Sequence, residues 1–165
     1  MRKVAVVIVA LLITACGKNR QSSIPWPAVI TNFERFSEAQ KEQLLTAVND
    51  LNTQAGKTVI TTSEGTGFPI SLKLVEPTED TKTRAGYAIL EDDKCNIEIS
   101  TIVFEPGRAD VIKPVLWHEI GHCVGLTHDP QQGEIMFRIT SGFTTYTKEA
   151  VQRFLYTMLT SAQLL

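Results

Sequence analysis

The three histidines of this chain all fall within one stretch of eleven residues, 118–128. They follow the pattern H-E-x-x-H-x-x-G-x-x-H, which places His118, His122 and His128 at fixed intervals. Imidazole is the commonest protein ligand for zinc, and three protein ligands with one open position are typical of a catalytic zinc site. The stretch therefore predicts one zinc ion per chain and a reaction carried out at it.

The spacing has a simple geometric reason if this stretch begins as a helix. His118 and His122 then lie one turn apart on the same face, so both rings can reach one metal ion. Glu119 lies beside that face, where it suits a base that takes a proton from metal-bound water. The third histidine requires the chain to leave the helix, and Gly125 can adopt the left-handed conformation of such a turn. Gly121, inside the helix, predicts close packing against a neighbouring segment.

The same stretch, followed by Glu134-Ile135-Met136, resembles the metzincin zinc endopeptidases. Within that clan, the form H-E-x-G-H-x-x-G-L-x-H is most similar to matrixins. The resemblance implies that Glu119 is the general base and that Met136 is the Met-turn residue beneath the metal. It also implies three zinc ligands: His118, His122 and His128. The alternatives are a relative that binds zinc without catalysis and an accidental cluster of histidines.

Alternating and helical spacing of apolar residues predicts the elements around the motif. The expected strands are 28–33, 57–62, 70–75, 85–90 and 95–104. The expected helices run from a cap at Ser37 to about residue 54, from about 114 to 124, and from a cap at Thr147 to about 160. This order resembles the metzincin catalytic domain. The resemblance implies an α+β, zincin-like fold: a twisted, mostly parallel sheet with an antiparallel edge strand, an active-site helix, a Met-turn and a C-terminal helix.

The resemblance also implies that strand 85–90 is the edge strand along the substrate cleft. An edge strand has unpaired backbone groups, which can hold an extended peptide by strand addition. The candidate contact residues are Ala85, Gly86, Tyr87 and Ala88. Gly86 would let that peptide approach closely. The alternative is an ordinary sheet edge without a substrate role.

The first residues predict an export signal. A short basic start precedes an unbroken apolar run of ten residues, 4–13, which is too short to span a bilayer and suits a secretory signal. The run ends at Ala15-Cys16 and resembles the lipobox of bacterial lipoproteins, which implies lipidation of Cys16 and a membrane anchor. Gly17, by the same resemblance, favours the outer membrane of the bacterial cell envelope. The alternative is ordinary cleavage after Ala15 with a free Cys16.

The remaining cysteines, Cys95 and Cys123, suggest a disulfide in an oxidising compartment. The bond would tie strand 95–104 to the motif helix. The alternative is Cys123 as a fourth zinc ligand. That position lies about 100° around the helix from His122, and a thiolate there would close the catalytic position.

The composition limits the kinds of partner that we expect for this protein. The chain has 165 residues, a net charge of −2 and no basic tract, so we expect no nucleic-acid partner. We expect a signal peptide at 1–15, a lipidated cysteine and tether at 16–27, and one monomeric catalytic domain at 28–165. A structural calcium ion is compatible with the resemblance, but the acidic residues show no pattern that identifies its site.

Together these features predict a membrane-anchored, zinc-dependent endopeptidase that hydrolyses peptide bonds by Glu119-assisted attack of zinc-bound water. Two alternatives remain open: a lipid-anchored module that binds peptide or cell-wall material around a non-catalytic zinc, and a zinc hydrolase of a non-protein substrate. Some metzincins have a tyrosine two residues after the Met, where this chain has Arg138. The nearest downstream tyrosine, Tyr146, is a candidate for a substrate role. Segment 137–146 would shape the specificity pocket by analogy.

Overall fold

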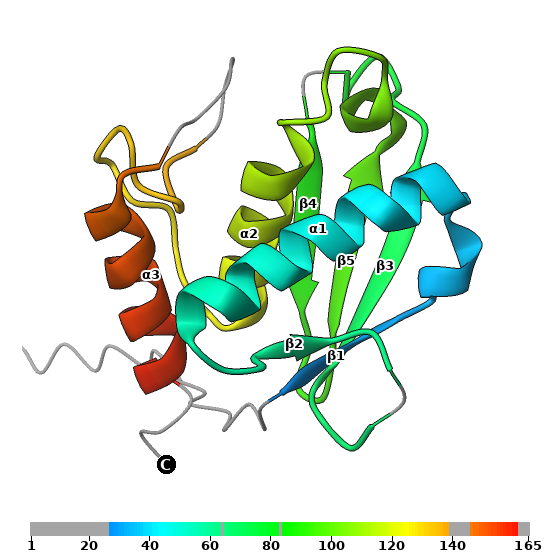
Figure 1. Cartoon of the computed structure of the whole chain (residues 1–165). Coiled ribbons are helices and arrows are strands. Elements are labelled where there is room, and N and C mark those ends of the chain that lie inside the picture. The colour runs from blue at the N-terminus through cyan, green and yellow to red at the C-terminus, as the bar shows by residue number, and fades with distance from the viewer. Residues whose placement is uncertain (1–26, 64, 83, 139–145, 162–165) are drawn as a thin grey trace, which may run out of the picture.

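The computed structural model describes residues 27–63, 65–82, 84–138 and 146–161 (Figure 1). The predicted signal peptide, Cys16 and all of the predicted tether before Pro27 lie outside these residues. Among the described residues, no helix has the length and apolar character needed to cross a membrane.

A five-stranded sheet forms the scaffold (Figure 1). Its strands are β1 (Ala28–Thr31), β2 (Ile60–Thr61), β3 (Pro69–Val75), β4 (Gly86–Leu90) and β5 (Cys95–Ser100). Their order is β2-β1-β3-β5-β4, and all neighbours are parallel except β4, which runs antiparallel to β5 at the edge. The mostly parallel sheet with an antiparallel edge strand is confirmed.

The predicted strand 95–104 is too long at its end. Ser100 is the last residue of β5, and the chain continues as a 3-10 helix, η2 (Thr101–Phe104). The neighbours of β5 explain the change, because β3 ends opposite Ser100 and β4 begins opposite Ile99. After Ser100, no strand among the described residues pairs with this segment, so the backbone closes its own bonds, as Glu105 N–H does to the Ile102 carbonyl.

The first predicted strand is also shorter than expected. It ends at Thr31, where Asn32 adopts a left-handed conformation with φ 61°, and a 3-10 turn follows as η1 (Phe33–Arg35). The predicted strand 57–62 is reduced to the two residues of β2.

Three helices accompany the sheet: α1 (Glu38–Ala55), α2 (Ile112–Cys123) and α3 (Lys148–Ser161). Ser37 and Gln40 form a capping box at the start of α1, and Gly56 ends it with φ 66°, as predicted. The Thr147 hydroxyl accepts a bond from Ala150 N–H at the start of α3. In Figure 1, α1 and α2 lie over one face of the sheet, and α3 lies beyond α2.

The core lies between the sheet and the first two helices. Side chains of both layers are almost completely buried there: Ile70, Leu72, Ile97, Ile99, Leu44, Leu51, Leu116 and Ile120. Trp117 of α2 belongs to this core and donates its indole N–H to the Ala47 carbonyl of α1. The predicted disulfide between Cys95 and Cys123 is present and joins the first residue of β5 to the last residue of α2. Helix α2 is therefore joined to α1 by a hydrogen bond and to β5 by a disulfide.

Candidate metal centre

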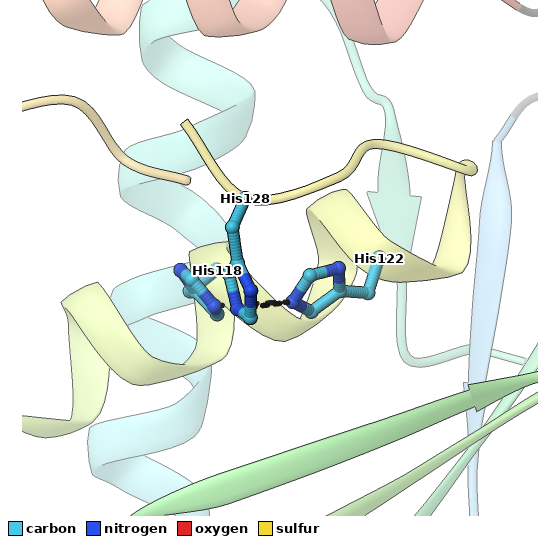
Figure 2. Close-up of side chains that lie close together, drawn as sticks. All are labelled: His118, His122 and His128. Atoms are coloured by element: carbon cyan, nitrogen blue, oxygen red, sulfur yellow. Dashed lines mark hydrogen bonds between the residues drawn. The ribbon is translucent and has the colours of Figure 1, made fainter. Parts of the chain in front are cut away.

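The three histidines converge on one point. His118 and His122 project from one face of α2, and His128 comes from the segment that follows (Figure 2). The Nε2 atom of His122 lies 3.1 Å from Nε2 of His118 and 3.2 Å from Nε2 of His128. His118 is buried, His122 is half-buried and His128 is exposed, so the point of convergence opens to solvent on one side.

A tight turn after α2 brings the third histidine back. Gly125 has φ 84°, the left-handed conformation expected from the sequence. The amide of Leu126 bonds to the Gly121 carbonyl at 2.9 Å, which closes the helix end. Asp129 then forms a turn, since its carboxylate accepts a bond of 2.7 Å from Gln131 N–H.

Backbone carbonyls orient two of the rings. The Ile135 carbonyl lies 2.8 Å from Nδ1 of His118, and the Leu126 carbonyl lies 2.8 Å from Nδ1 of His122. A carbonyl can only accept, so each Nδ1 carries a proton, and in a neutral ring each Nε2 then presents a lone pair to the shared point. At 3.1 Å these lone pairs face each other.

This arrangement fits a tetrahedral zinc site. With zinc–nitrogen bonds of about 2.0–2.1 Å, two nitrogens on one zinc ion are separated by about 3.3 Å. A cation between the rings would also remove the repulsion of the lone pairs. The three histidines could therefore hold a metal ion, and no other such group of three occurs among the residues the structure describes. Cys123 is excluded as a fourth ligand because its sulfur is bonded to Cys95.

Burial favours the neutral form of two of the three histidines, His118 and His128. The pKa of His118 falls to about 4, mainly because burial disfavours the charged ring, and the nearby His122 and His128 add to this effect. The bond to the Ile135 carbonyl acts in the opposite direction. The pKa of His128 is also lowered, first by desolvation and then by His122 and Arg138. Neutral imidazoles are the form that binds metal.

Glu119 lies buried beside the triad. Burial raises its pKa to about 7, while the Ala88 backbone N–H and the charge of Arg84 oppose the rise. Gly86 leaves room for this side chain, since a β-carbon there would lie 2.7 Å from Oε1 of Glu119. The predicted reason for Gly86 is therefore corrected, because the Glu119 side chain fills the space that was expected to admit a peptide.

The segment after His128 supports the triad from below. Met136 is buried with its sulfur against Gly121, where a β-carbon would overlap it, so the predicted close packing at Gly121 is confirmed. The Met136 carbonyl accepts a bond of 2.9 Å from Asp129 N–H, and its neighbour Ile135 holds the first histidine ring. The sequence placed Met136 in this segment but did not indicate that the Ile135 carbonyl orients His118.

An ion pair that no sequence pattern indicated also fixes the segment beneath the histidines. Glu134, at the start of the Met136 segment, is buried and forms an ion pair with Arg153 of α3. The pair ties the segment beneath the histidines to the last helix. Opposite charges nineteen residues apart give no local signal, because the two residues meet only when α3 packs against the segment that carries Glu134.

A cleft of about 900 Å³ passes over the triad. One wall is the edge strand, and the other is formed by α2 and the turn after it. All four edge-strand candidates line this cleft together with the triad and Glu119: Ala85, Gly86, Tyr87 and Ala88. Arg84 and Arg138 also line it.

Tyr146 is not among the described residues that line the cleft. Its ring stacks on Trp117 with centroids 6.5 Å apart, and burial raises the pKa of its phenol. Its hydroxyl has no hydrogen-bond partner among the described residues. Most of the segment predicted to shape the specificity pocket, 139–145, lies outside the part of the chain that the structure describes.

Comparisons with known proteins give distant likenesses to solved structures. No protein-family model matches the sequence, and no curated protein matches it significantly. Among solved structures, archaemetzincin from Methanopyrus kandleri is similar over 87% of this chain and 98% of its own, at 11% identity and a TM-score of 0.47. The GM1-bound form of the ECX AB5 holotoxin is similar over 70% of this chain, at 15% identity and a TM-score of 0.39, and this chain spans 60% of that one.

Proposed function

We propose that this protein is a zinc-dependent endopeptidase. The observation that carries the proposal is the convergence of three imidazoles beside a buried carboxylate, inside a cleft with a sheet edge as one wall. His118, His122 and His128 would hold the metal. A zinc ion in the triad would supply a Lewis acid that lowers the pKa of water and polarises a carbonyl oxygen.

Glu119 is the proton-transfer group of this chain. A base with a pKa of about 7 can take a proton from water and release it again near neutral pH. Glu119 would therefore receive the proton of the attacking water and deliver it to the amine that leaves when the peptide bond breaks. The Ala88 N–H, which lowers this pKa, would hold the carboxylate in place during both transfers.

The edge strand would bind the substrate backbone. Strand β4 pairs with β5 on one side, and no strand pairs with its other side among the described residues. An extended peptide can add to such an edge through backbone hydrogen bonds, which hold a chain without selecting its sequence. Because Ala88 of this strand also contacts Glu119, a peptide bound along β4 would run past the proton-transfer group.

We also propose that the enzyme is monomeric and anchored to the bacterial cell envelope through lipidated Cys16, with protein or peptide as its substrate. Replacement of Cys16 by Ser should then move the protein from the detergent phase to the aqueous phase on Triton X-114 partition. Equal partition of both proteins would contradict the anchor and leave the enzyme proposal untouched.

The decisive experiment compares the purified protein with its Glu119→Gln variant on a diverse peptide pool analysed by mass spectrometry. The wild type should cut peptides with zinc and stop when a chelator is added. The variant should bind one zinc equivalent and cut at least about 100-fold more slowly. Glu79→Gln removes an exposed carboxylate that pairs only with Lys82 on the surface, outside the cleft lining, and should match the wild type.

Two results would contradict the proposal. A Glu119→Gln protein that cuts at the wild-type rate would remove Glu119 from the mechanism. Zinc binding without any cleavage by the wild type would instead favour a peptide-binding module or a hydrolase of non-protein material.

A further inference from the structure

Two arginines line the cleft around the metal site. Arg84 lies two residues before the edge strand β4, and Arg138 follows Met136 by two residues. Both side chains are exposed and both line the cleft. The only acidic residue in the described lining is Glu119, although the whole chain has a net charge of −2. The charge of the cleft is therefore opposite to that of the chain.

Arg84 is held at one part of the cleft. Its guanidinium carbon lies 4.6 Å from the centroid of the Tyr87 ring, a cation–π contact that restricts where the side chain can go. It is close enough to Glu119 to influence that carboxylate electrostatically. Among the described residues, no carboxylate forms an ion pair with Arg84. Its guanidinium group is thus positioned without a direct ion-pair partner among the described residues, and it also lines a smaller pocket with Glu76 and Glu98.

Arg138 occupies a different part of the same cleft. It acts electrostatically on His128, the histidine on the side of the triad open to solvent. Within the part of the chain that the structure describes, it too lacks a carboxylate partner. One arginine therefore neighbours the proton-transfer group and the other neighbours a metal ligand, so both lie within reach of a peptide at the metal site.

We propose that the cleft selects peptide segments with Asp or Glu side chains close to the cleaved bond, and that Arg84 and Arg138 bind those carboxylates. This inference rests on the proposed function, whose substrate class it narrows. A guanidinium group recognises a carboxylate through two parallel hydrogen bonds, which lysine cannot reproduce. A positive cleft on a negatively charged chain also concentrates acidic segments at the site where they are cut.

The test measures a ratio of rates rather than a rate. Pairs of peptides that differ only by Asp against Asn near the cut are compared in the wild type, Arg84→Gln and Arg138→Gln. The ratio matters because Arg84 also acts on Glu119, so its removal alters the rate on every substrate, and this effect cancels within a pair. Arg35→Gln removes an exposed arginine outside the cleft lining and serves as the matched control.

The wild type and Arg35→Gln should prefer the Asp peptides by about fivefold or more, in a salt-dependent manner. Each cleft variant should lose most of the preference that depends on its own arginine. Wild-type cleavage without an Asp preference, or a preference that survives in the Arg84→Gln, Arg138→Gln double variant, would overturn the inference while leaving the endopeptidase intact. A preference that requires a free C-terminal carboxylate, absent with amidated peptides, would also overturn it.

A binding measurement separates this inference from the proposed function. The zinc-loaded Glu119→Gln protein is titrated with fluorescent Asp and Asn peptides, and anisotropy gives both dissociation constants. The Asp peptides should bind more tightly than the Asn peptides, and replacement of either arginine by Gln in this background should remove the difference. This result would support recognition of acidic side chains even if the protein cleaves no peptide. Equal binding of the two peptides refutes it independently of catalysis.

Discussion

Replacing Glu119 by Gln should stabilise the metal-free protein above pH 7. In the fold the pKa of this carboxyl rises from 4.5 to about 7 because burial disfavours the charged form. The unfolded chain loses the proton near pH 4.5 and the folded chain keeps it to about pH 7. Folding therefore takes up a proton between these values, and the stability of the wild type falls as pH rises through them. Gln has the same shape and stays neutral, so it escapes this loss.

The magnitude follows from the two pKa values. A difference of this size corresponds to about 3 kcal/mol once both states are ionised. The side chain is only 6% exposed, so solvent screening removes little of it. Urea unfolding with a chelator and no reductant gives the free energy of unfolding of both proteins. The variant should exceed the wild type by about 3 kcal/mol at pH 8 and by less than about 1 kcal/mol at pH 5.

His118 titrates in the opposite sense, since its pKa is lowered to about 4, and it destabilises the fold as pH falls below its unfolded value of 6.5. This contribution is common to both proteins and disappears in their difference. Glu79→Gln removes an exposed carboxylate from a surface ion pair with Lys82, so it should change the free energy of unfolding by less than about 1 kcal/mol. A Glu119→Gln protein that is equally or less stable at pH 8 would refute the argument that burial raises this pKa.

Three further outcomes follow from the packing and the metal site. Gly121→Ala should lower the free energy of unfolding by about 1–3 kcal/mol despite its better helix propensity, because the new methyl group meets the Met136 sulfur; an unchanged urea midpoint would contradict that contact. Reducing the Cys95–Cys123 bond should cost about 3–4 kcal/mol, and identical unfolding curves with and without reductant would show that it contributes nothing. His128→Ala should weaken zinc binding by more than about 100-fold, because mutating even a residue that only hydrogen-bonds to a zinc ligand can cost about 10–100-fold in affinity. A variant with the wild-type zinc affinity, measured by chelator competition, would exclude His128 as a ligand.

The sequence alone determined the features that depend on local geometry. His118 and His122 are one helical turn apart wherever that segment is helical, and a glycine at position 125 permits the left-handed turn that follows. The caps at Ser37 and Gly56 act within a few residues of themselves, so they too were predictable. These features need no knowledge of what lies across the fold.

Strand ends depended on neighbours instead. Segment 95–104 carries an apolar pattern along its whole length, yet the ladder stops at Ser100 because β3 extends no further there. Likewise, Gly86 predicted a close approach, but only the packing of β4 against α2 shows that the approaching group is Glu119.

Only the tertiary structure determined the pKa values, the ring orientation and the charge of the site. The pKa of Glu119 rises because the fold buries it between α2 and β4, and the Ile135 carbonyl orients His118 only after the chain has returned beneath the helix. Arg84 and Arg138, which are far apart in the sequence, line the same cleft. Desolvation, ring orientation and the meeting of charges depend on distances across the fold, whereas ligand identity and spacing are written along the chain.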